Sequence, residues 1–344
     1  MGFRGAANEY IASYLANRFQ HTQVGDFKSG PLPVTKGVPQ GSIIGPLLFC
    51  LYINDICYVV EVEVVLFADD AAFFITATSV KELYFKINKL FEQLSRYLDN
   101  NKLIPNLNKS KLMYFNSRPF PSEGLEDLYF REIAIEWVSD YKYLGLTLSN
   151  KMSFAPHIDL VSGRLSRFTG IFHHLRKIVP LSVLRTLYHS FILPYITLHI
   201  EVWGSAPEVY IHGLSVKQNK LLRAILGTPV VNGRPIGHVI DMYRNLNILT
   251  VNNVYRLHLF KFLMFVLKQS SMFYNLLLRP LEITHTYRMR NSTYRQPMIT
   301  CEVDRRGITN QMVQMHTQID ITEFSSLQLK LAVRKYKKQL LNSQ

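Results

Sequence analysis

Two adjacent carboxylates enclosed by two apolar runs constrain this chain more than any other feature. Asp69 and Asp70 separate the run 64–68 from the run 71–75. Each run has the length and the residue types of a short buried strand, so the pattern predicts a β-hairpin with the Asp pair at its tip. Burying ionised carboxylates without partners costs roughly several kcal/mol, and the pair therefore requires a cation, a hydrogen-bond cage or water.

Two interpretations of the Asp pair follow. Carboxylate oxygens suit hard cations such as Mg²⁺, which binds through one or two carboxylates together with the phosphates of a substrate. This chemistry belongs to phosphoryl and nucleotidyl transfer. Alternatively, the pair forms only a solvated turn, because Asp side chains favour turns through hydrogen bonds to their own backbone.

The composition limits the class of protein. With 344 residues, of which 48% are hydrophobic, the chain is long enough for two domains and can bury a sizeable core. It contains 39 Lys and Arg against 25 Asp and Glu, which gives a net charge of +14. This charge favours polyanionic partners, with nucleic acid first and an acidic membrane surface second. A cationic surface that only keeps the protein in solution is the alternative.

The sequence indicates neither membrane insertion nor disulfide bonding. No apolar run approaches the roughly 18 uncharged residues of a membrane span, so we expect no transmembrane segment. The three cysteines, Cys50, Cys57 and Cys301, form neither a disulfide framework nor a zinc pattern. This predicts a reducing intracellular setting and does not distinguish nucleus from cytoplasm.

Upstream of the Asp pair, the sequence predicts a helix, a bent loop and a second helix. Apolar residues recur at helical spacing from Glu9 to Phe19. The segment Lys36–Ser42 combines glycines with a stiffening proline, which suits a loop that lies against a flat ligand or, alternatively, a plain turn before a core helix. Ser42 is a candidate cap for that helix. Four of the helix's apolar residues are expected to be buried: Leu47, Leu48, Leu51 and Tyr52.

Downstream of the Asp pair, Ser79–Glu82 has the pattern of a capping box, and an apolar stripe continues from it to Leu98. We expect this helix to cover the sheet that carries Asp69, in an α+β arrangement. Segments 112–115 and 133–137 have strand character, and 141–148 is the expected hairpin partner of the second. Lys109 and Lys111 can approach a phosphate or, alternatively, lie on a solvated surface.

From about residue 150, helical patterns replace strand patterns. Helices are expected within 158–174, 181–193 (closed by Pro194), 207–226 and 251–268. A polar, loosely ordered segment 284–310 and a basic helix over 327–341 follow, and the basic helix is suited to phosphates or simply solvated. The pair His173-His174 lacks metal-site spacing and predicts a structural or surface role. The helical half also carries basic residues, among them Arg164, Arg167, Lys217 and Lys220.

Several motifs, taken together, resemble one known family. They are Tyr14-Leu15-Ala16-Asn17-Arg18, Gly37–Phe49, Tyr52-Ile53-Asn54-Asp55, Phe67-Ala68-Asp69-Asp70, Asn106 with Lys109-Ser110, Tyr141–Gly145 and Glu201-Val202-Trp203-Gly204. In order and spacing, they are similar to the reverse transcriptases of non-LTR retrotransposons (LINE and jockey-like elements). The resemblance extends from residue 1 to about residue 280.

The resemblance implies a right-hand polymerase fold of the α+β class. Residues 1–150 would form the palm and part of the fingers, and 151–280 a helical thumb-like domain. Residues 281–344 would form a basic C-terminal extension with a terminal helix. The implied activity is RNA-directed DNA synthesis by two-metal nucleotidyl transfer to a primer 3′-hydroxyl. The implied partners are an RNA template, a DNA primer or RNA–DNA hybrid, dNTPs and two Mg²⁺ ions.

The resemblance also implies roles for particular residues. Asp69 and Asp70 would hold the metals, and Lys109 would lie near the triphosphate and donate a proton to the leaving group. The nucleotide- and template-contacting loop would be formed by Gly37, Pro39, Gln40, Gly41 and Ser42. The primer end would meet Tyr143, Leu144 and Gly145. The phosphate backbone would run along Arg164, Arg167, Lys217 and Lys220.

One implied motif is absent from this sequence. Members of the family carry a further metal-binding Asp upstream of the Tyr14–Arg18 motif, and Gly2-Phe3-Arg4-Gly5 resembles the turn that follows it. We therefore expect an N-terminally truncated enzyme that is inactive alone. The alternatives are a nucleic-acid-binding remnant without catalysis and a remnant without function. In a smaller departure, Pro105 stands where the family has an aliphatic residue, which affects the placement of Lys109.

Overall fold

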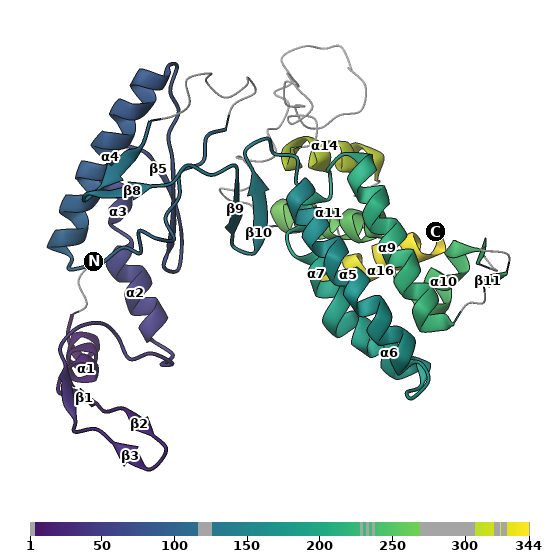
Figure 1. Ribbon diagram of the computed structural model, residues 1–344, viewed down its shortest axis with the longest axis horizontal. Helices are drawn as coiled ribbons and strands as arrows, with labels where there is room; N and C mark the ends of the chain where they lie inside the picture. The colour runs from purple at the N-terminus through teal and green to yellow at the C-terminus, as the bar shows by residue number, and fades with distance from the viewer. Residues whose placement is uncertain are drawn as a thin grey trace. The chain divides into compact units, whose positions relative to one another are not determined.

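The computed structural model describes residues 4–115, 126–227, 230–231, 234–235, 238–268, 307–319, 324 and 329–343 (Figure 1). The chain divides into two units: Met1–Lys111 with Glu126–Glu136, and Leu112–Leu125 with Trp137–Gln344. Across the described residues, helices occur together with two-stranded antiparallel sheets, which confirms the mixed helix-and-sheet class. None of the described helices is long and apolar enough to cross a membrane. The domain boundaries expected at residues 150 and 280 stay predictions.

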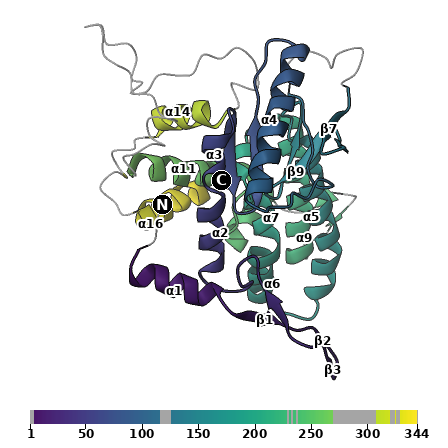
Figure 2. The ribbon, with the colours of Figure 1, turned by 90° about the vertical axis from the view of Figure 1, so that its left-hand side faces the viewer.

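The first unit begins with a helix and a narrow ribbon. Helix α1 spans Ala6–Leu15, and β1 (Arg18–Gln20) pairs with β4 (Leu32–Val34). Between them, β2 (Gln23–Val24) and β3 (Phe27–Lys28) form a small hairpin (Figure 2). The predicted end of the helix at Phe19 is therefore wrong, because α1 ends at Leu15. Asn17 adopts a left-handed φ of 53°, a conformation that Asn tolerates better than most residues, and the chain leaves the helix there.

Two short helices precede the Asp pair. Helix α2 spans Gly45–Ile53, and α3 spans Ile56–Val59. Ile53 and Ile56 join the core of the first unit, but three of the four α2 residues expected to be buried are exposed: Leu47, Leu51 and Tyr52. The helix is apolar on most of its sides, so its sequence does not single out the face that packs.

The Asp pair lies on the predicted hairpin. Strand β5 (Glu63–Phe67) pairs with β6 (Asp70–Phe74), and helix α4 (Val80–Asn100) packs against one face of the hairpin, where Val64, Leu66 and Phe73 contact the core. The other face leaves Val65, Phe67 and Phe74 exposed. The hairpin and its covering helix are confirmed, whereas full burial of the two strands is wrong because the described residues cover only one face.

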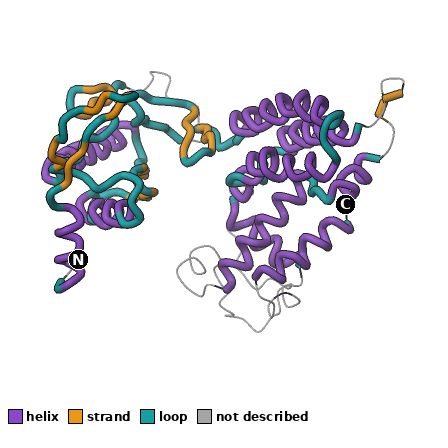
Figure 3. The backbone as a smooth tube through the Cα atoms, turned by 90° about the horizontal axis from the view of Figure 1, so that it is seen from below, coloured by secondary structure: helices purple, strands orange, loops and turns teal. Residues whose placement is uncertain are grey.

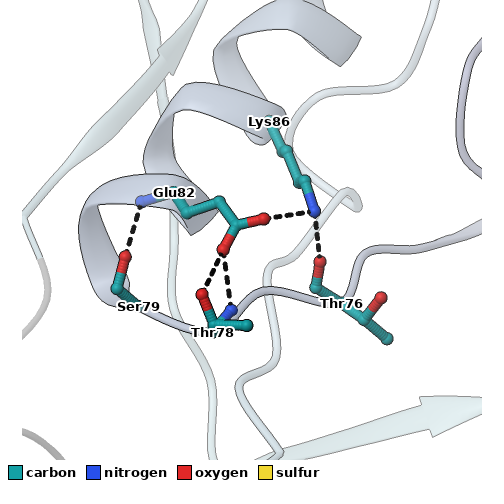
Figure 4. A network of polar contacts seen from close by, with 5 residues as sticks. All are labelled: Thr76, Thr78, Ser79, Glu82 and Lys86. Carbon is teal, nitrogen blue, oxygen red and sulfur yellow. Dashed lines mark hydrogen bonds and ion pairs between the residues drawn. The ribbon is translucent and has the colours of Figure 1, made fainter.

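A polar network fixes the start of α4 (Figure 4). The Ser79 hydroxyl oxygen accepts a hydrogen bond from the Glu82 backbone N–H at 3.2 Å. The Glu82 carboxylate reaches back to the Thr78 N–H and hydroxyl at 2.8 and 2.7 Å, and Lys86 bridges Glu82 to the Thr76 carbonyl. The Lys86 and Thr78 hydrogen bonds lower the pKa of Glu82 to about 2. The predicted capping box is present, with Thr78 rather than Ser79 as the donor to the carboxylate.

Replacing Ser79 by alanine is expected to lower the free energy of unfolding of the first unit by about 1 kcal/mol, because a helix N–H loses its cap. Urea titration followed by circular dichroism measures the difference. Ser166→Ala is the matched control, since this exposed hydroxyl only contacts the Ser162 carbonyl of its own helix. A Ser79→Ala midpoint equal to that of the control would contradict the capping role.

Two hairpins follow α4, and their pairing differs from the prediction. Strand β8 (Ile133–Ile135) pairs with β7 (Leu128–Phe130), while β9 (Asp140–Tyr143) pairs with β10 (Leu146–Ser149). The expected partnership of 133–137 with 141–148 is wrong. The β7–β8 turn uses Arg131 and Glu132 at φ 49° and 67°, positions that usually favour Gly or Asn, so the sequence gives no turn signal. The expected strand 112–115 reduces to one bridge, between Leu112 and Trp137.

The second unit is mainly helical (Figure 3). Its elements besides β9 and β10 are α5 (Ala155–Leu175), α6 (Leu181–Leu187), the π-helix η1 (Tyr188–Ile192), α7 (Leu193–Thr197), α8 (Ile200–Trp203), α9 (Glu208–Leu226), β11 (Val230–Val231), β12 (Arg234–Pro235), α10 (Val239–Leu246), α11 (Val251–Lys268), α14 (Ile308–Gln318) and α16 (Leu329–Asn342). One hydrophobic core runs through the unit. Most of the polar segment 284–310 lies outside the described residues.

The segment expected as one helix over 181–193 is divided by η1. Pro194 does not close it, because Pro194 lies in the first turn of α7, where a missing N–H costs nothing. The basic helix expected over 327–341 corresponds to α16. It is not wholly solvated, since Ala332, Tyr336 and Leu340 are buried. The Tyr336 ring stacks on the Phe260 ring, with the two ring centres 4.2 Å apart.

Candidate functional site

The Asp pair forms the tip of the β5–β6 hairpin. Phe67 pairs with Asp70 across the turn, and Ala68 takes a left-handed φ of 52°. Both Asp side chains are exposed, so the expectation that burial requires a partner for them is wrong. Their oxygens are the donors that a hard divalent cation prefers. Among the described residues, no group of three or more His, Cys, Asp and Glu side chains gathers at a possible metal site.

The loop 37–42 has the backbone that its glycines predict. Gly37 and Gly41 take φ values of 74° and 81°, which other residues adopt only with strain. The Ser42 hydroxyl donates to the Pro39 carbonyl at 2.7 Å and accepts from the Gly45 N–H at 3.0 Å, so the loop is tied to the start of α2.

Arg18 braces this loop from outside. Its guanidinium donates to the Gly37 carbonyl at 2.6 Å and to the Leu15 carbonyl at 2.9 Å. Arg18 ends the motif Tyr14-Leu15-Ala16-Asn17-Arg18, which by itself does not predict this bracing contact. Gln40 is exposed on the braced loop, where its amide is accessible to a ligand.

The two lysines after α4 lie in different surroundings. Lys109 is exposed in a turn whose backbone N–H groups bond to the Asn106 carbonyl and side chain. Lys111 pairs with Glu136 at 2.7 Å. Lys111 therefore has a structural partner on the surface, and the role of Lys109 stays a prediction.

The turn 143–145 belongs to the second unit, and two histidines that no sequence motif marks hold the turn and the strand that follows it. Leu144 and Gly145 take φ values of 49° and 90°. The ring Nε2 of His199 lies 2.9 Å from the Leu144 carbonyl, and the ring Nδ1 of His157 accepts the Thr147 N–H at 3.3 Å. Isolated histidines form no sequence pattern, so no signal in the sequence could have identified them.

His157 is a buried titratable group behind this turn. Its side chain is 4% exposed, its ring lies 5.6 Å from that of Trp203, and its Nε2 has no hydrogen-bond partner among the described residues. Burial, with a smaller contribution from the nearby His199, lowers the pKa of His157 to about 4. The imidazole is therefore neutral at physiological pH.

Two neighbouring helices carry the predicted basic residues. Arg164 and Arg167 are exposed on α5, and Lys217 and Lys220 lie on α9, half-buried and exposed respectively; the two helices pack together. The Arg164 guanidinium lies 4.4 Å from the centre of the Tyr195 ring. None of the four forms a salt bridge with another described residue. Their charges are thus available to an anionic partner.

The candidate residues divide between the units. The Asp pair, the loop 37–42 and Lys109 belong to the first unit, and the turn 143–145 and the basic helix residues belong to the second. The roles assigned to these residues stay predictions.

Comparison with known proteins shows which family the first part of the chain resembles. Residues 2–148 match the family of reverse transcriptases (RNA-dependent DNA polymerases). This region, which contains the glycine loop, the Asp hairpin and the turn 143–145, therefore matches the reverse transcriptase family, as its motifs predicted.

Three relatives show which members of this family the chain resembles. The chain is 26% identical over 231 residues to the RNA-directed DNA polymerase from mobile element jockey of Drosophila melanogaster, covering 64% of this chain and 25% of that protein. It is also 26% identical over 253 residues to the probable RNA-directed DNA polymerase from transposon BS of the same species, covering 70% and 27%. A third relative, from transposon X-element, is 26% identical over 226 residues, covering 63% and 24%. The chain thus resembles non-LTR retrotransposon polymerases and spans about a quarter of their length.

Proposed function

We propose that this chain is the palm and thumb region of an RNA-directed DNA polymerase. The observation that carries the proposal is the family match over residues 2–148, which includes an exposed Asp pair on a hairpin tip. In the proposed reaction, the 3′ oxygen of a primer bonds to the α-phosphorus of a dNTP, and the bond to the leaving pyrophosphate breaks. An RNA strand serves as the template.

In this proposal, Asp69 and Asp70 hold divalent cations. Two exposed carboxylates on a short turn offer oxygen ligands and leave room for water and substrate phosphates to complete the coordination. When bound, Mg²⁺ supplies positive charge for the attacking hydroxyl and for the leaving pyrophosphate.

Other side chains bind and orient the substrates. Gln40 contacts the nucleotide and template from a loop that Arg18 and Ser42 hold in shape. Lys109 donates a proton to the leaving group. The turn 143–145, held by His199, supports the primer end. The cations on α5 and α9 follow the phosphate backbone without reading its sequence.

We further propose that a third carboxylate joins the Asp pair before catalysis. The support is the family resemblance, in which another metal-binding Asp lies upstream of the Tyr14–Arg18 motif. Asp55 does not substitute for it, because its carboxylate accepts the Tyr97 hydroxyl at 2.6 Å. The second candidate function is nucleic-acid binding without catalysis. It is favoured by the net charge of +14 and by the four basic residues on α5 and α9 that form no salt bridge with a described residue.

Primer extension on an RNA template tests the proposal. The purified chain is assayed with dNTPs and Mg²⁺, beside an EDTA control and the double variant Asp69→Ala, Asp70→Ala, and hybrid binding is measured in parallel. We expect salt-sensitive binding and no extension. Extension that both controls abolish would support the polymerase but overturn the need for a third carboxylate. Absence of both binding and extension would overturn the proposed function.

Replacing both Arg164 and Arg167 by glutamine is expected to reduce the slope of log K against log salt concentration by about 1.5, because each of the two phosphate contacts contributes roughly 0.7 to 0.9. Fluorescence anisotropy of a labelled hybrid at several salt concentrations gives the slope. The double variant Lys81→Gln, Arg96→Gln removes the same charge from α4 and should leave the slope unchanged. Equal slopes for the two double variants would place the contact elsewhere.

A further inference from the structure

The second unit contains a small cavity lined by basic side chains. Its volume is about 180 Å³, and the lining comes from η1, α7, the α10–α11 connection, α11 and α16. Four of the lining residues are basic and half-buried: His189, His258, Lys261 and Lys337. Leu193, Val254 and Val333 contribute apolar wall.

Among the residues that the structure describes, acidic groups do not balance this charge. Glu201 is the nearby described carboxylate, and its Oε1 lies 2.9 Å from Nδ1 of His258. Neither Lys337 nor His189 forms an ion pair with a described residue. Lys261 interacts with the Glu201 carboxylate only through longer-range electrostatic attraction. The cavity therefore combines partial burial with an excess of positive charge, an arrangement that costs free energy unless an anion is present.

The pKa values of two of these groups show that their surroundings disfavour positive charge. Burial and the nearby Lys337 lower the pKa of Lys261, although Glu201 opposes them. Burial, then Lys337, then Arg185 lower the pKa of His189. Each group is thus in surroundings that disfavour its own cation, and a bound anion would relieve both.

A buried hydrogen bond holds one part of the cavity wall in place. Tyr188 lies beside His189 in the π-helix, and its hydroxyl is fixed by Gln218 at 2.8 Å. π-Helices are rare and occur mostly as single turns, frequently at functional sites. A fixed wall with donors from separate helices is a preorganised binding site.

We propose that this cavity binds a phosphate group, held by Lys261, Lys337 and His189. Cavities for drug-sized ligands measure about 300 to 1,000 Å³, so this smaller one suits a compact anion or a single group of a larger molecule. A phosphate offers several acceptor oxygens to donors that converge from different helices. The group comes either from free phosphate or from a nucleic-acid backbone. The site does not involve Asp69 or Asp70, so it stands independently of the proposed polymerase activity.

Inorganic phosphate is the first probe. Calorimetric titration of the full chain, at ionic strength held constant with chloride, is expected to give saturable binding. Lys261→Met and Lys337→Met should each weaken binding by at least about tenfold, since each removes a charged hydrogen-bond donor. Lys338→Met, one position further along α16 and exposed, should bind as the wild-type chain does. Lys337→Arg should retain binding, which separates loss of the site from misfolding.

The outcomes are decisive in either direction. No saturable binding by the wild-type chain, or equal affinity in Lys337→Met and Lys338→Met, would overturn the proposal. A short thymidine oligonucleotide then distinguishes the sources. Displacement of phosphate by the oligonucleotide assigns the cavity to backbone phosphates, and persistence of phosphate binding assigns it to the free anion. Failure of primer extension affects neither result.

Discussion

Gln218→Leu is expected to lower the free energy of unfolding of the second unit by about 4 kcal/mol. Gln218 is fully buried, and its amide uses all of its hydrogen-bonding groups. It donates to the Tyr188 hydroxyl and the Leu249 carbonyl at 2.8 and 3.0 Å. It accepts from the Tyr243 hydroxyl and the Val251 N–H at 2.9 and 3.2 Å.

The physical reason is the number of buried groups that one substitution leaves unpaired. Leucine has nearly the volume of glutamine, so no large cavity forms, but the Leu249 carbonyl and the Val251 N–H lose their partner away from water. Each such loss costs about 1 to 3 kcal/mol. Tyr243 suffers less, because its hydroxyl also contacts Asn219 at 2.6 Å.

Urea unfolding followed by circular dichroism measures this effect. Gln339→Leu is the matched control, since the same substitution at an exposed position of α16 should change the midpoint little. Tyr188→Phe should produce an intermediate loss, because one donor of the amide is left unpaired. A Gln218→Leu midpoint close to that of Gln339→Leu would show that the network does not stabilise the fold.

The second large effect is acid destabilisation through His157. The pKa of this imidazole is about 4 in the folded chain and about 6.5 when unfolded. Between these values the unfolded state binds the proton more strongly, so stability falls as the pH falls from about 6.5 to about 4. Full protonation would remove about 3 kcal/mol of stability.

His157→Asn isolates this contribution. The asparagine carbonyl can accept the Thr147 N–H in place of the imidazole Nδ1 and does not titrate. We expect the variant to lose less stability than the wild-type chain between pH 7 and pH 4.5, in chemical denaturation at each pH. Parallel stability curves for the two proteins would show that His157 does not titrate below its usual range. Other groups with lowered pKa values, such as His189 and Glu82, contribute equally to both curves.

Local sequence signals predicted the parts of the fold that depend on local interactions. The Ser79 capping box and the stripe Leu83, Ile87 and Leu90 specify the start and the buried face of α4. The apolar runs around Asp69 specify a hairpin, and Gly37 and Gly41 specify a bent loop. In each case the residues themselves determine the conformation.

Features that depend on distant neighbours could not be predicted. Burial of α2 and of the β5–β6 hairpin depends on how many layers cover them, which an all-apolar pattern does not indicate. The pairing of β8 with β7 rests on a turn at Arg131 and Glu132 that lacks the usual Gly or Asn. Lys261 and Lys337 are far apart in sequence and meet only through helix packing, so their cavity has no sequence signature.

The π-helix Tyr188–Ile192 restricts which changes of length this chain can tolerate. Such a turn accommodates an additional residue within a helical segment. Deleting one residue there would convert the turn to ordinary α-helix and rotate the preceding and following side chains relative to each other by about 100°. Because Leu184 and Ile196 are buried on the two sides of the turn, the deletion would turn one of them away from the core. The segment is therefore a place where substitutions are more tolerable than a one-codon deletion.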